Sequence, residues 1–245
     1  MTPAPPRRSA EKPQKRALLL DALGTLLELQ PPAPRLRQEL GRRLGLQVSE
    51  TAAQRAIAAE IDYYRAHLSE GRDQASLADL RRRCGEVVAR ELTHDLGRPV
   101  PADARMIESL LAALQFTRFA DVVPGLEALR RLGLRLVVVS NWDVSLHSAL
   151  ARLGVAQLVD AVLTSAEAGA RKPAPAIFEQ ALELAGVPAA AARHVGDSVE
   201  EDVSGARAAG IEPILIRRDG SGGPSGVITV SALTQLPELL LPPAE

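Results

Sequence analysis

The spacing of apolar and polar residues follows two different patterns along this chain, and the pattern of its second half is typical of a layered α/β protein. From about residue 120 onward, short continuous apolar runs such as LRLVVVSN (134–141) and EPILIRR (212–218) indicate buried strands. Between them lie segments with the apolar spacing of helices, for example DVSLHSALARLG (143–154) and PAPAIFEQALELAG (173–186). Because such alternation implies parallel strands with right-handed crossovers, the pattern predicts a doubly wound, Rossmann-like parallel sheet.

A long helical block separates the first strand from this alternating region. Residues 17–21, ALLLD, form a short buried run, whereas residues 33–117 show helical periodicity almost throughout and no strand. Gly45, Gly71 and Gly97 stand where three of these helices are expected to end. The block is therefore predicted to be a bundle inserted into the α/β domain. Its four expected helices cover 33–45, 49–71, 75–97 and 101–116.

These patterns predict a chain in three parts. Residues 16–30 and 118–245 form the α/β core, and residues 31–117 form the inserted helical bundle. Residues 1–15 are rich in proline and charge, and we expect them to be a disordered tail. The tail lacks the hydrophobic region of a signal peptide, and the apolar stretch behind it is short and contains Asp21, so no signal peptide or membrane span is expected.

The composition narrows the function classes. Lys and Arg together number 29 against 30 Asp and Glu, so no overall charge recruits nucleic acid or an anionic membrane. Aromatic residues make up only 2% of the chain, which disfavours base-stacking platforms. The single cysteine, Cys84, cannot form an internal disulfide and is expected to be a buried thiol in a reducing compartment. We therefore expect a cytoplasmic protein that binds neither nucleic acid nor membrane.

Polar residues gather where the predicted strands end. Asp21 follows the first strand, Ser140 and Asn141 end the next, and Asp197 follows a short strand at 193–196. Ligands of open parallel sheets bind at the carboxyl ends of the strands, so these side chains should converge. Lys172, just before a helix that begins with proline, is expected at the same edge. Carboxylates, a hydroxyl and a lysine in one place suit an anion and a hard divalent cation.

Four segments in this order resemble the motifs of the haloacid dehalogenase (HAD) superfamily. They are DALGTL, VVVSN, RKP and GDSVEEDVSGARAAG, at 21–26, 137–141, 171–173 and 196–210. The helical insertion after the first motif resembles the helical cap of that superfamily, and the likeness covers about 17–240. Position 23 is leucine, so the chain is most similar to a phosphatase-like branch that lacks the second aspartate of the first motif.

The resemblance implies a phosphatase that forms an aspartyl-phosphate. Asp21 would be the nucleophile that attacks phosphorus, and Lys172 would neutralise the charge that develops there. Ser140, Asn141 and Thr25 would bind the phosphate or support the turn beside it. The substrate would be a small phosphorylated metabolite.

A magnesium site is implied by the same resemblance. Mg²⁺ would be held by the carboxylates of Asp21 and Asp197 and by the backbone carbonyl of Leu23, with retained waters. Asp202 would hold a metal-bound water or orient Lys172; alternatively, it is an ordinary solvated carboxylate of a helix.

Leu23 can neither protonate a leaving oxygen nor activate water, although most HAD phosphatases carry an aspartate there. General acid–base help is worth roughly 10²–10⁴ in rate. Three explanations remain open: a substrate with a good leaving group, an acid supplied by the cap, or a weakly active protein that mainly binds. Candidates for a cap acid share one predicted helix; they are Asp62, Tyr63, Tyr64 and His67.

Two other functions fit part of the pattern. A 2-haloacid dehalogenase also lacks the second aspartate, but it needs no magnesium and typically loses the acid that stands here as Asp197. A non-catalytic binding module is the other alternative. Asp143 is interpreted as a helix cap and Trp142 as a residue of the site's rim. None of the four histidines shows metal-ligand spacing, so none is assigned a role. The substrate and the oligomeric state stay open.

Overall fold

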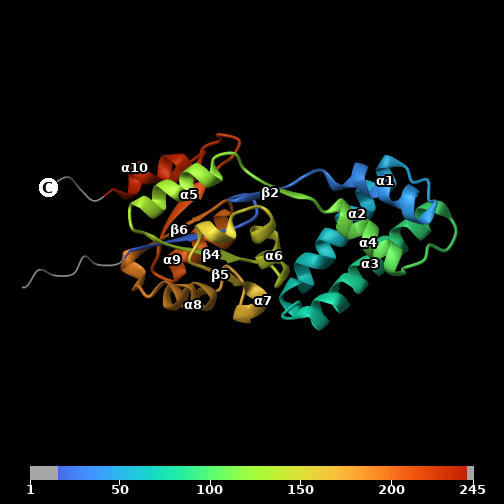
Figure 1. Cartoon of the computed structure of the whole chain (residues 1–245), viewed down its shortest axis with the longest axis horizontal. Coiled ribbons are helices and arrows are strands. Elements are labelled where there is room, and N and C mark those ends of the chain that lie inside the picture. The colour runs from blue at the N-terminus through green and yellow to red at the C-terminus, as the bar shows by residue number, and fades with distance from the viewer. Residues whose placement is uncertain (1–15, 242–245) are drawn as a thin grey trace, which may run out of the picture.

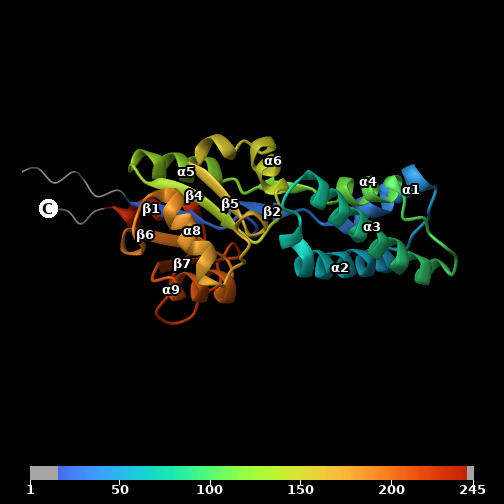
Figure 2. The same ribbon diagram turned by 90° about the horizontal axis from the view of Figure 1, so that it is seen from below.

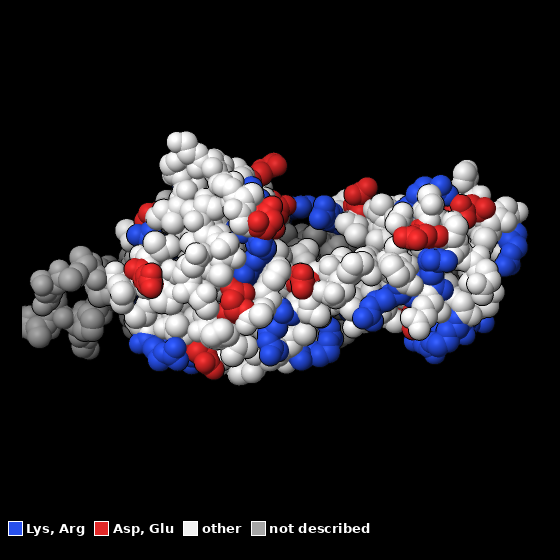
Figure 3. Space-filling model, turned by 90° about the horizontal axis from the view of Figure 1, so that it is seen from above, with Lys and Arg blue, Asp and Glu red and all other residues white. Residues whose placement is uncertain are grey.

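The computed structural model describes residues 16–241 and places them in two lobes, one built on a sheet and one made of helices (Figure 1). The predicted tail, residues 1–15, lies outside the described residues. Within the described part, none of the helices combines the length and the hydrophobicity needed to cross a bilayer. Basic and acidic side chains are interspersed over the face of both lobes that Figure 3 shows.

Six parallel strands form the main sheet, in the order β5-β4-β1-β6-β7-β8, which confirms the predicted doubly wound architecture. From β1 the chain adds β4 and then β5 on one side of this strand. It then crosses back and adds β6, β7 and β8 on the other side. This reversal beside β1 is the switch point at which such sheets bind ligands. The strands are β1 (Ala17–Leu20), β4 (Arg135–Ser140), β5 (Ala161–Thr164), β6 (Ala192–Gly196), β7 (Glu212–Ile216) and β8 (Ile228–Val230).

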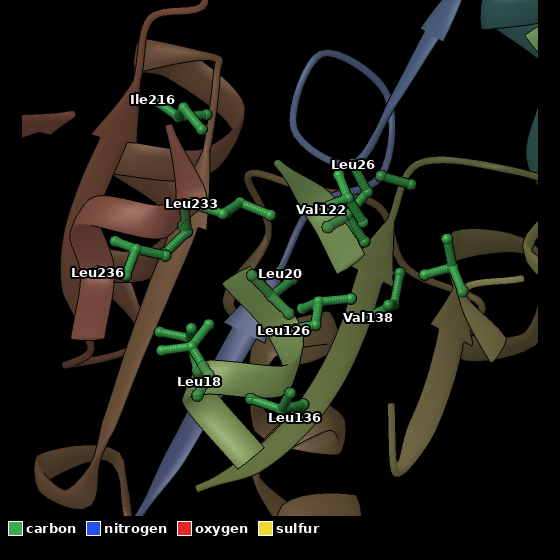
Figure 4. Close-up of a cluster of buried hydrophobic side chains, with 14 of the residues drawn as sticks. Leu18, Leu20, Leu26, Val122, Leu126, Leu136, Val138, Ile216, Leu233 and Leu236 are labelled. Atoms are coloured by element: carbon green, nitrogen blue, oxygen red, sulfur yellow. The ribbon is translucent and has the colours of Figure 1, made fainter. Parts of the chain in front are cut away.

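Helices cover both faces of this sheet (Figure 2). Successive side chains of a strand point to opposite faces, so a strand buried on both sides is apolar throughout. Leu18 and Leu20 accordingly pack in a cluster with α5, α6 and α10, part of which is shown in Figure 4. Ala17 and Leu19 face α8 and α9. The helices of this lobe are α5 (Val122–Arg131), α6 (Ser145–Arg152), α7 (Ser165–Ala168), α8 (Pro175–Ala185), α9 (Gly205–Ala208) and α10 (Leu236–Leu240).

The helical lobe follows its sequence signals closely. Ser49, Asp73 and Asp103 cap three of its helices by accepting hydrogen bonds from the backbone of the first turn. Gly45 and Gly97 end two helices in the left-handed conformation that favours glycine. The apolar sides of the helices meet in a core of their own. The helices are α1 (Pro32–Leu44), α2 (Glu50–His67), α3 (Gln74–Leu96) and α4 (Ala104–Ala113).

The prediction that residues 33–117 contain no strand is wrong. Strand β3 (Phe116–Arg118) pairs antiparallel with β2 (Leu27–Leu29), so a two-stranded ribbon connects the lobes. Local sequence hides β3, because its apolar residue continues the helical spacing of α4 and its pairing partner lies far back in the chain. The ribbon spans the predicted boundary at 117/118, and the division into core and cap stays a prediction.

Candidate active site

Asp21 lies at the centre of the sheet, directly after β1. Its backbone N–H donates to the Val195 carbonyl at 2.9 Å, so the residue still belongs to the ladder between β1 and β6. Its side chain is buried, and the hydroxyl of Ser140 donates to Asp21 Oδ1 at 3.1 Å. Because β4 pairs in parallel with β1, the end of one strand brings its serine to the end of the other.

Lys172 is buried between two carboxylates. Its Nζ lies 2.6 Å from Asp21 Oδ1 and 2.6 Å from Asp202 Oδ1, and the side chain is 1% exposed. A lysine buried to this degree is rare unless it is paired, as it is here. The predicted Asp21, Ser140, Lys172 and Asp202 are therefore in direct contact, and Asp202 is buried in this cluster rather than solvated.

Asn141 holds the backbone of Lys172 with both ends of its amide. Its Oδ1 accepts from the Lys172 N–H at 2.8 Å, and its Nδ2 donates to the Lys172 carbonyl at 3.0 Å. Both ends are thus engaged within the protein, and the expected contact of this amide with substrate stays a prediction. Sequence alone could not distinguish the two uses, since the partner lies 31 positions away.

Burial and charge act against each other in this cluster. Burial raises the pKa of Asp21, and although the charge of Lys172 opposes this, the nearby Asp202 and Asp197 help to raise it to about 6. Burial alone would lower the pKa of Lys172, but its two carboxylates hold it above the ordinary value. Burial would likewise raise the pKa of Asp202, yet Lys172 and a hydrogen bond from His194 keep it below its ordinary value. Lys172 therefore stays charged between the carboxylates.

His194 is a site residue that the sequence did not reveal. It is completely buried in β6, and its Nε2 lies 2.9 Å from Asp202 Oδ1. Because a carboxylate only accepts, the Nε2–H is the donor. The Ser198 N–H donates to the other oxygen, Asp202 Oδ2, at 3.0 Å. The earlier assignment of no role to any histidine is corrected here, because only the packing of β6 against the following turn brings His194 to Asp202.

The residues present fit a divalent cation. Asp21, Asp197 and Asp202 each offer a carboxylate oxygen, and these oxygens all lie within 4.8 Å of one another. Three carboxylates and one lysine leave two negative charges, which one divalent cation would neutralise. Gly24 makes room for this arrangement, because a Cβ there would come within 2.1 Å of Asp197 Oδ2. Oxygen donors of this kind suit Mg²⁺.

The turn after β1 leaves the predicted carbonyl ligand out of its own hydrogen bonds. The Leu27 N–H donates to the Ala22 carbonyl, and the Gly24 N–H donates to the Leu27 carbonyl. Within residues 16–241, the Leu23 carbonyl between them accepts no backbone hydrogen bond of this turn. The oxygens of Asp202, by contrast, already accept from the protein. Asp21, Leu23 and Asp197 therefore remain the better candidate ligands, with Asp202 beside them.

Thr25 is completely buried in the same turn. Its carbonyl accepts a hydrogen bond from Arg218, whereas its hydroxyl has no partner among residues 16–241. Arg218 is itself held by Asp121 at 2.8 Å and lies over the ring of Phe119. The expected contact of Thr25 with phosphate stays a prediction, and its hydroxyl is available for it.

The comparison with known proteins decides the family. Residues 15–210 match the family model of the haloacid dehalogenase-like hydrolases. The chain belongs to this family. It is 34% identical over 213 residues to the haloacid dehalogenase-like hydrolase domain-containing protein 3 of Bos taurus, a match that covers 84% of each chain. The resemblance seen in the four motifs is thereby confirmed, and the protein is a HAD-like hydrolase.

Two further relatives carry different activities in their names. The glyceraldehyde 3-phosphate phosphatase of Methanopyrus kandleri is 35% identical over 123 residues, which make up 47% of this chain and 53% of that protein. The crystal structure of the 2-haloacid dehalogenase from Pseudomonas syringae is 27% identical with a TM-score of 0.64, and the match covers 93% of this chain and 98% of that one.

In this HAD-like hydrolase the predicted cap acids are not positioned alike. Asp62 is exposed, Tyr63 contacts Arg83 through its hydroxyl, and His67 stacks on Tyr63. Only Tyr64 lines the cavity beside Leu23, where its hydroxyl donates to Asp143 Oδ2 at 2.9 Å. Burial and the charge of Asp143 hold the pKa of Tyr64 well above its ordinary value, which makes it a poor acid.

A cavity of about 410 Å³ lies between the two lobes and is lined by residues of both. Leu23, 37% exposed, forms part of its wall together with Asn141 and Trp142. These three residues come from the same turns as Asp21 and Ser140, so the cavity adjoins the carboxylate cluster. Asp143, at this wall, also accepts from the Ser145 N–H at 2.7 Å, as expected of a helix cap.

Proposed function

We propose that this HAD-like hydrolase is a Mg²⁺-dependent phosphatase that acts on a small phosphorylated metabolite through an aspartyl-phosphate. The observation that carries the proposal is the buried cluster of Asp21, Lys172 and Asp202, with Asp197 close enough to share a cation. The phosphatase among the named relatives supports it. When bound, the cation would supply charge neutralisation for the incoming phosphoryl group.

Asp21 offers two carboxylate oxygens, of which Oδ1 accepts hydrogen bonds from both Ser140 and Lys172. The attacking oxygen forms a bond to phosphorus while the bond from phosphorus to the leaving oxygen breaks, and that leaving oxygen keeps the electron pair. Water then attacks the phosphorus of the acyl phosphate, which releases inorganic phosphate and restores Asp21.

Lys172 is held in place for both steps. Asn141 fixes its backbone, and Asp202, oriented by His194, fixes its ammonium group. A cation held without reorganisation stabilises charge that develops on the phosphoryl oxygens more effectively than a mobile one. Thr25 and Ser140 contribute hydroxyl groups at the same end of the sheet.

The test is release of inorganic phosphate from acetyl phosphate and phenyl phosphate, with and without Mg²⁺. We expect metal-dependent release that falls at least about 10³-fold in Asp21→Asn. Asp219→Asn, the same change at an exposed position in the loop after β7 and outside the carboxylate cluster, is the matched control and should retain activity. Equal rates for Asp21→Asn and the wild type would reject the mechanism. No turnover of any phosphate would favour the binding-module alternative.

Dehalogenation is the second candidate. Like the dehalogenases, this chain lacks the second aspartate of the first motif, which is replaced here by Leu23, and it resembles one of them over nearly its whole length. In that reaction Asp21 attacks carbon and halide leaves. The metal site formed with Asp197 would then be unnecessary. Halide release from 2-chloropropionate that persists in the presence of a chelator would favour this candidate over the phosphatase.

A further inference from the structure

Glu60 is a buried carboxyl group that the proposed chemistry does not use. It lies on α2, is 3% exposed, and lines the cavity between the lobes. It forms no ion pair within residues 16–241, and the thiol of Cys84 lies beside it. Burial raises the pKa of Glu60 to about 7. A buried acid without a cation keeps its proton readily and can then donate a hydrogen bond.

The position of Glu60 relative to the reaction centre follows from the helix. Tyr64, one turn later on the same side of α2, contacts Asp143 of the sheet lobe. Glu60 therefore lies about 6 Å farther from this contact along the helix axis. A substrate with its phosphate at Asp21 would reach Glu60 only with the distant end of its organic group.

Most of the wall between these two points is apolar. Leu23 and Trp142 flank the reaction centre, and Phe116 lies against Trp142 with ring centroids 5.0 Å apart. Helices α3 and α4 add Leu77, Leu80, Leu110 and Leu111, and Leu114 follows directly after α4. The hydroxyl groups of a sugar would find few partners along such a wall, whereas hydrocarbon or an aromatic ring would be desolvated favourably.

The charged groups around the cavity favour a neutral polar group at its end. Arg65 and Arg152, which are exposed, and the half-buried Arg81 line it, and their charges attract a phosphate dianion and repel a cationic substituent. The titratable groups nearest to Glu60 are Cys84 on α3 and Tyr64 on its own helix. Arg81 on α3 and Asp143 from the sheet lobe line the same cavity. The lining residues of α4 carry no charge.

We infer that the substrate's leaving group is an apolar body that ends in one uncharged hydrogen-bond acceptor, and that Glu60 donates a hydrogen bond to this acceptor from its protonated carboxyl group. The inference rests on the proposed phosphatase function and names its substrate class. Glu60 is thus a specificity-determining residue, and the pocket differs from what a short, polar triose phosphate needs.

Three aryl phosphates with similar leaving oxygens test this inference. They are phenyl phosphate, 4-butylphenyl phosphate and 4-(3-oxobutyl)phenyl phosphate, and the last carries a ketone that can only accept. We expect kcat/KM for the butyl compound to exceed that of phenyl phosphate by at least about tenfold. A lower value for the butyl compound would overturn the apolar part of the inference.

Comparison of the ketone with the butyl compound measures the contribution of Glu60 separately from that of the apolar wall. The ratio of KM for the butyl compound to KM for the ketone should be maintained in Glu60→Gln, whose amide still donates, and should fall about tenfold in Glu60→Leu. As the pH rises through 7, the wild type loses the donor proton, so its ratio should fall; that of Glu60→Gln should not. This comparison of pH profiles decides the matter even if Glu60→Leu fails to fold.

The outcomes separate the inference from the proposed function. The role of Glu60 would be overturned if the ratio of KM for the butyl compound to KM for the ketone were equal in the wild type, Glu60→Gln and Glu60→Leu, or if this ratio rose with pH. Phosphate release would in that case still support the phosphatase. A preference for the 4-(4-aminobutyl)phenyl analogue over the ketone would overturn the neutral acceptor. Absence of phosphate release from every aryl phosphate, with Asp21→Asn indistinguishable from the wild type, would reject the phosphatase itself.

Discussion

Leucine at position 23 is the residue that sets this site apart from a complete phosphatase. Its side chain reaches the cavity beside the carboxylate cluster and offers no proton. Neither exposed Asp62 nor Tyr64, whose pKa is raised, replaces the missing acid. An alkoxide leaves poorly without a proton, whereas an acyl or aryl oxyanion leaves well. For the proposed phosphatase we therefore expect Leu23 to favour acyl and aryl leaving groups and to leave the proposed metal ligands in place.

Restoring the acid tests this interpretation. Leu23→Asp should raise turnover of alkyl phosphates by about 10- to 100-fold and change that of acetyl or phenyl phosphate far less, because only alkyl esters need the proton. Leu23→Asn, similar in size but unable to donate as an acid, is the matched control. Steady-state rates at saturating Mg²⁺ give the comparison, and equal gains for both substrate classes would contradict it.

Among the structural elements, the turn after β1 brings a special backbone conformation against Asp197 of the carboxylate cluster. Gly24 has a φ of +80°, which side chains rarely adopt, and the Asp197 carboxylate occupies the space of its missing Cβ. Gly45, at the end of α1, has a φ of +65° with open space around it. The two glycines share a backbone requirement but differ in whether a carboxylate lies against them.

This difference gives a matched pair of substitutions. Gly24→Ala and Gly45→Ala should each lose roughly 1–2 kcal/mol of unfolding free energy from the left-handed backbone. Gly24→Ala should in addition displace Asp197 and raise the Mg²⁺ concentration for half-maximal activity at least about tenfold, since a ligand is moved. Thermal denaturation and Mg²⁺ titration measure the two effects. Equal Mg²⁺ requirements in both variants would contradict the role given to the turn.

Apolar periodicity and capping residues predicted some secondary-structure elements correctly and missed others. The capped helices of the helical lobe and the apolar strands appear where periodicity places them. Strand β3 was missed because its partner is far away in sequence. The segment after Ser198 begins with a π-helical turn, η4 (Val199–Ser204), in which the N–H groups of Asp202 and Val203 both donate to the Ser198 carbonyl. That wide turn carries Asp202, and such turns are frequent at functional sites.

At the scale of the whole molecule, the lobes meet through a small set of polar contacts beside the cavity. Tyr64 donates to Asp143, and the Val144 N–H donates to the Gly71 carbonyl at 3.0 Å. Arg171, next to Lys172, donates to the Arg65 carbonyl. The arrangement of the lobes around the cavity therefore includes hydrogen bonds that single substitutions can remove.

Tyr64→Phe should weaken this closure without unfolding either lobe. Loss of a hydrogen bond to a carboxylate costs roughly 1.5–3 kcal/mol, so exchange of the Val144 amide hydrogen should accelerate by about tenfold or more. Tyr63→Phe is the matched control, because that hydroxyl contacts Arg83 within the helical lobe. Hydrogen exchange followed by NMR measures both variants. Unchanged protection of Val144 in Tyr64→Phe would show that the contact does not hold the lobes together.

The sequence by itself determined the fold class, the family and the strand ends that carry Asp21, Ser140 and Asp197, because these depend on periodicity and short motifs within one segment. Only the tertiary structure showed that His194 orients Asp202 and that Glu60 faces the cavity. Their partners come from other segments or the other lobe, and local sequence does not specify which buried faces meet. Packing between segments decided how the site is supported and which side chains line the cavity beside it.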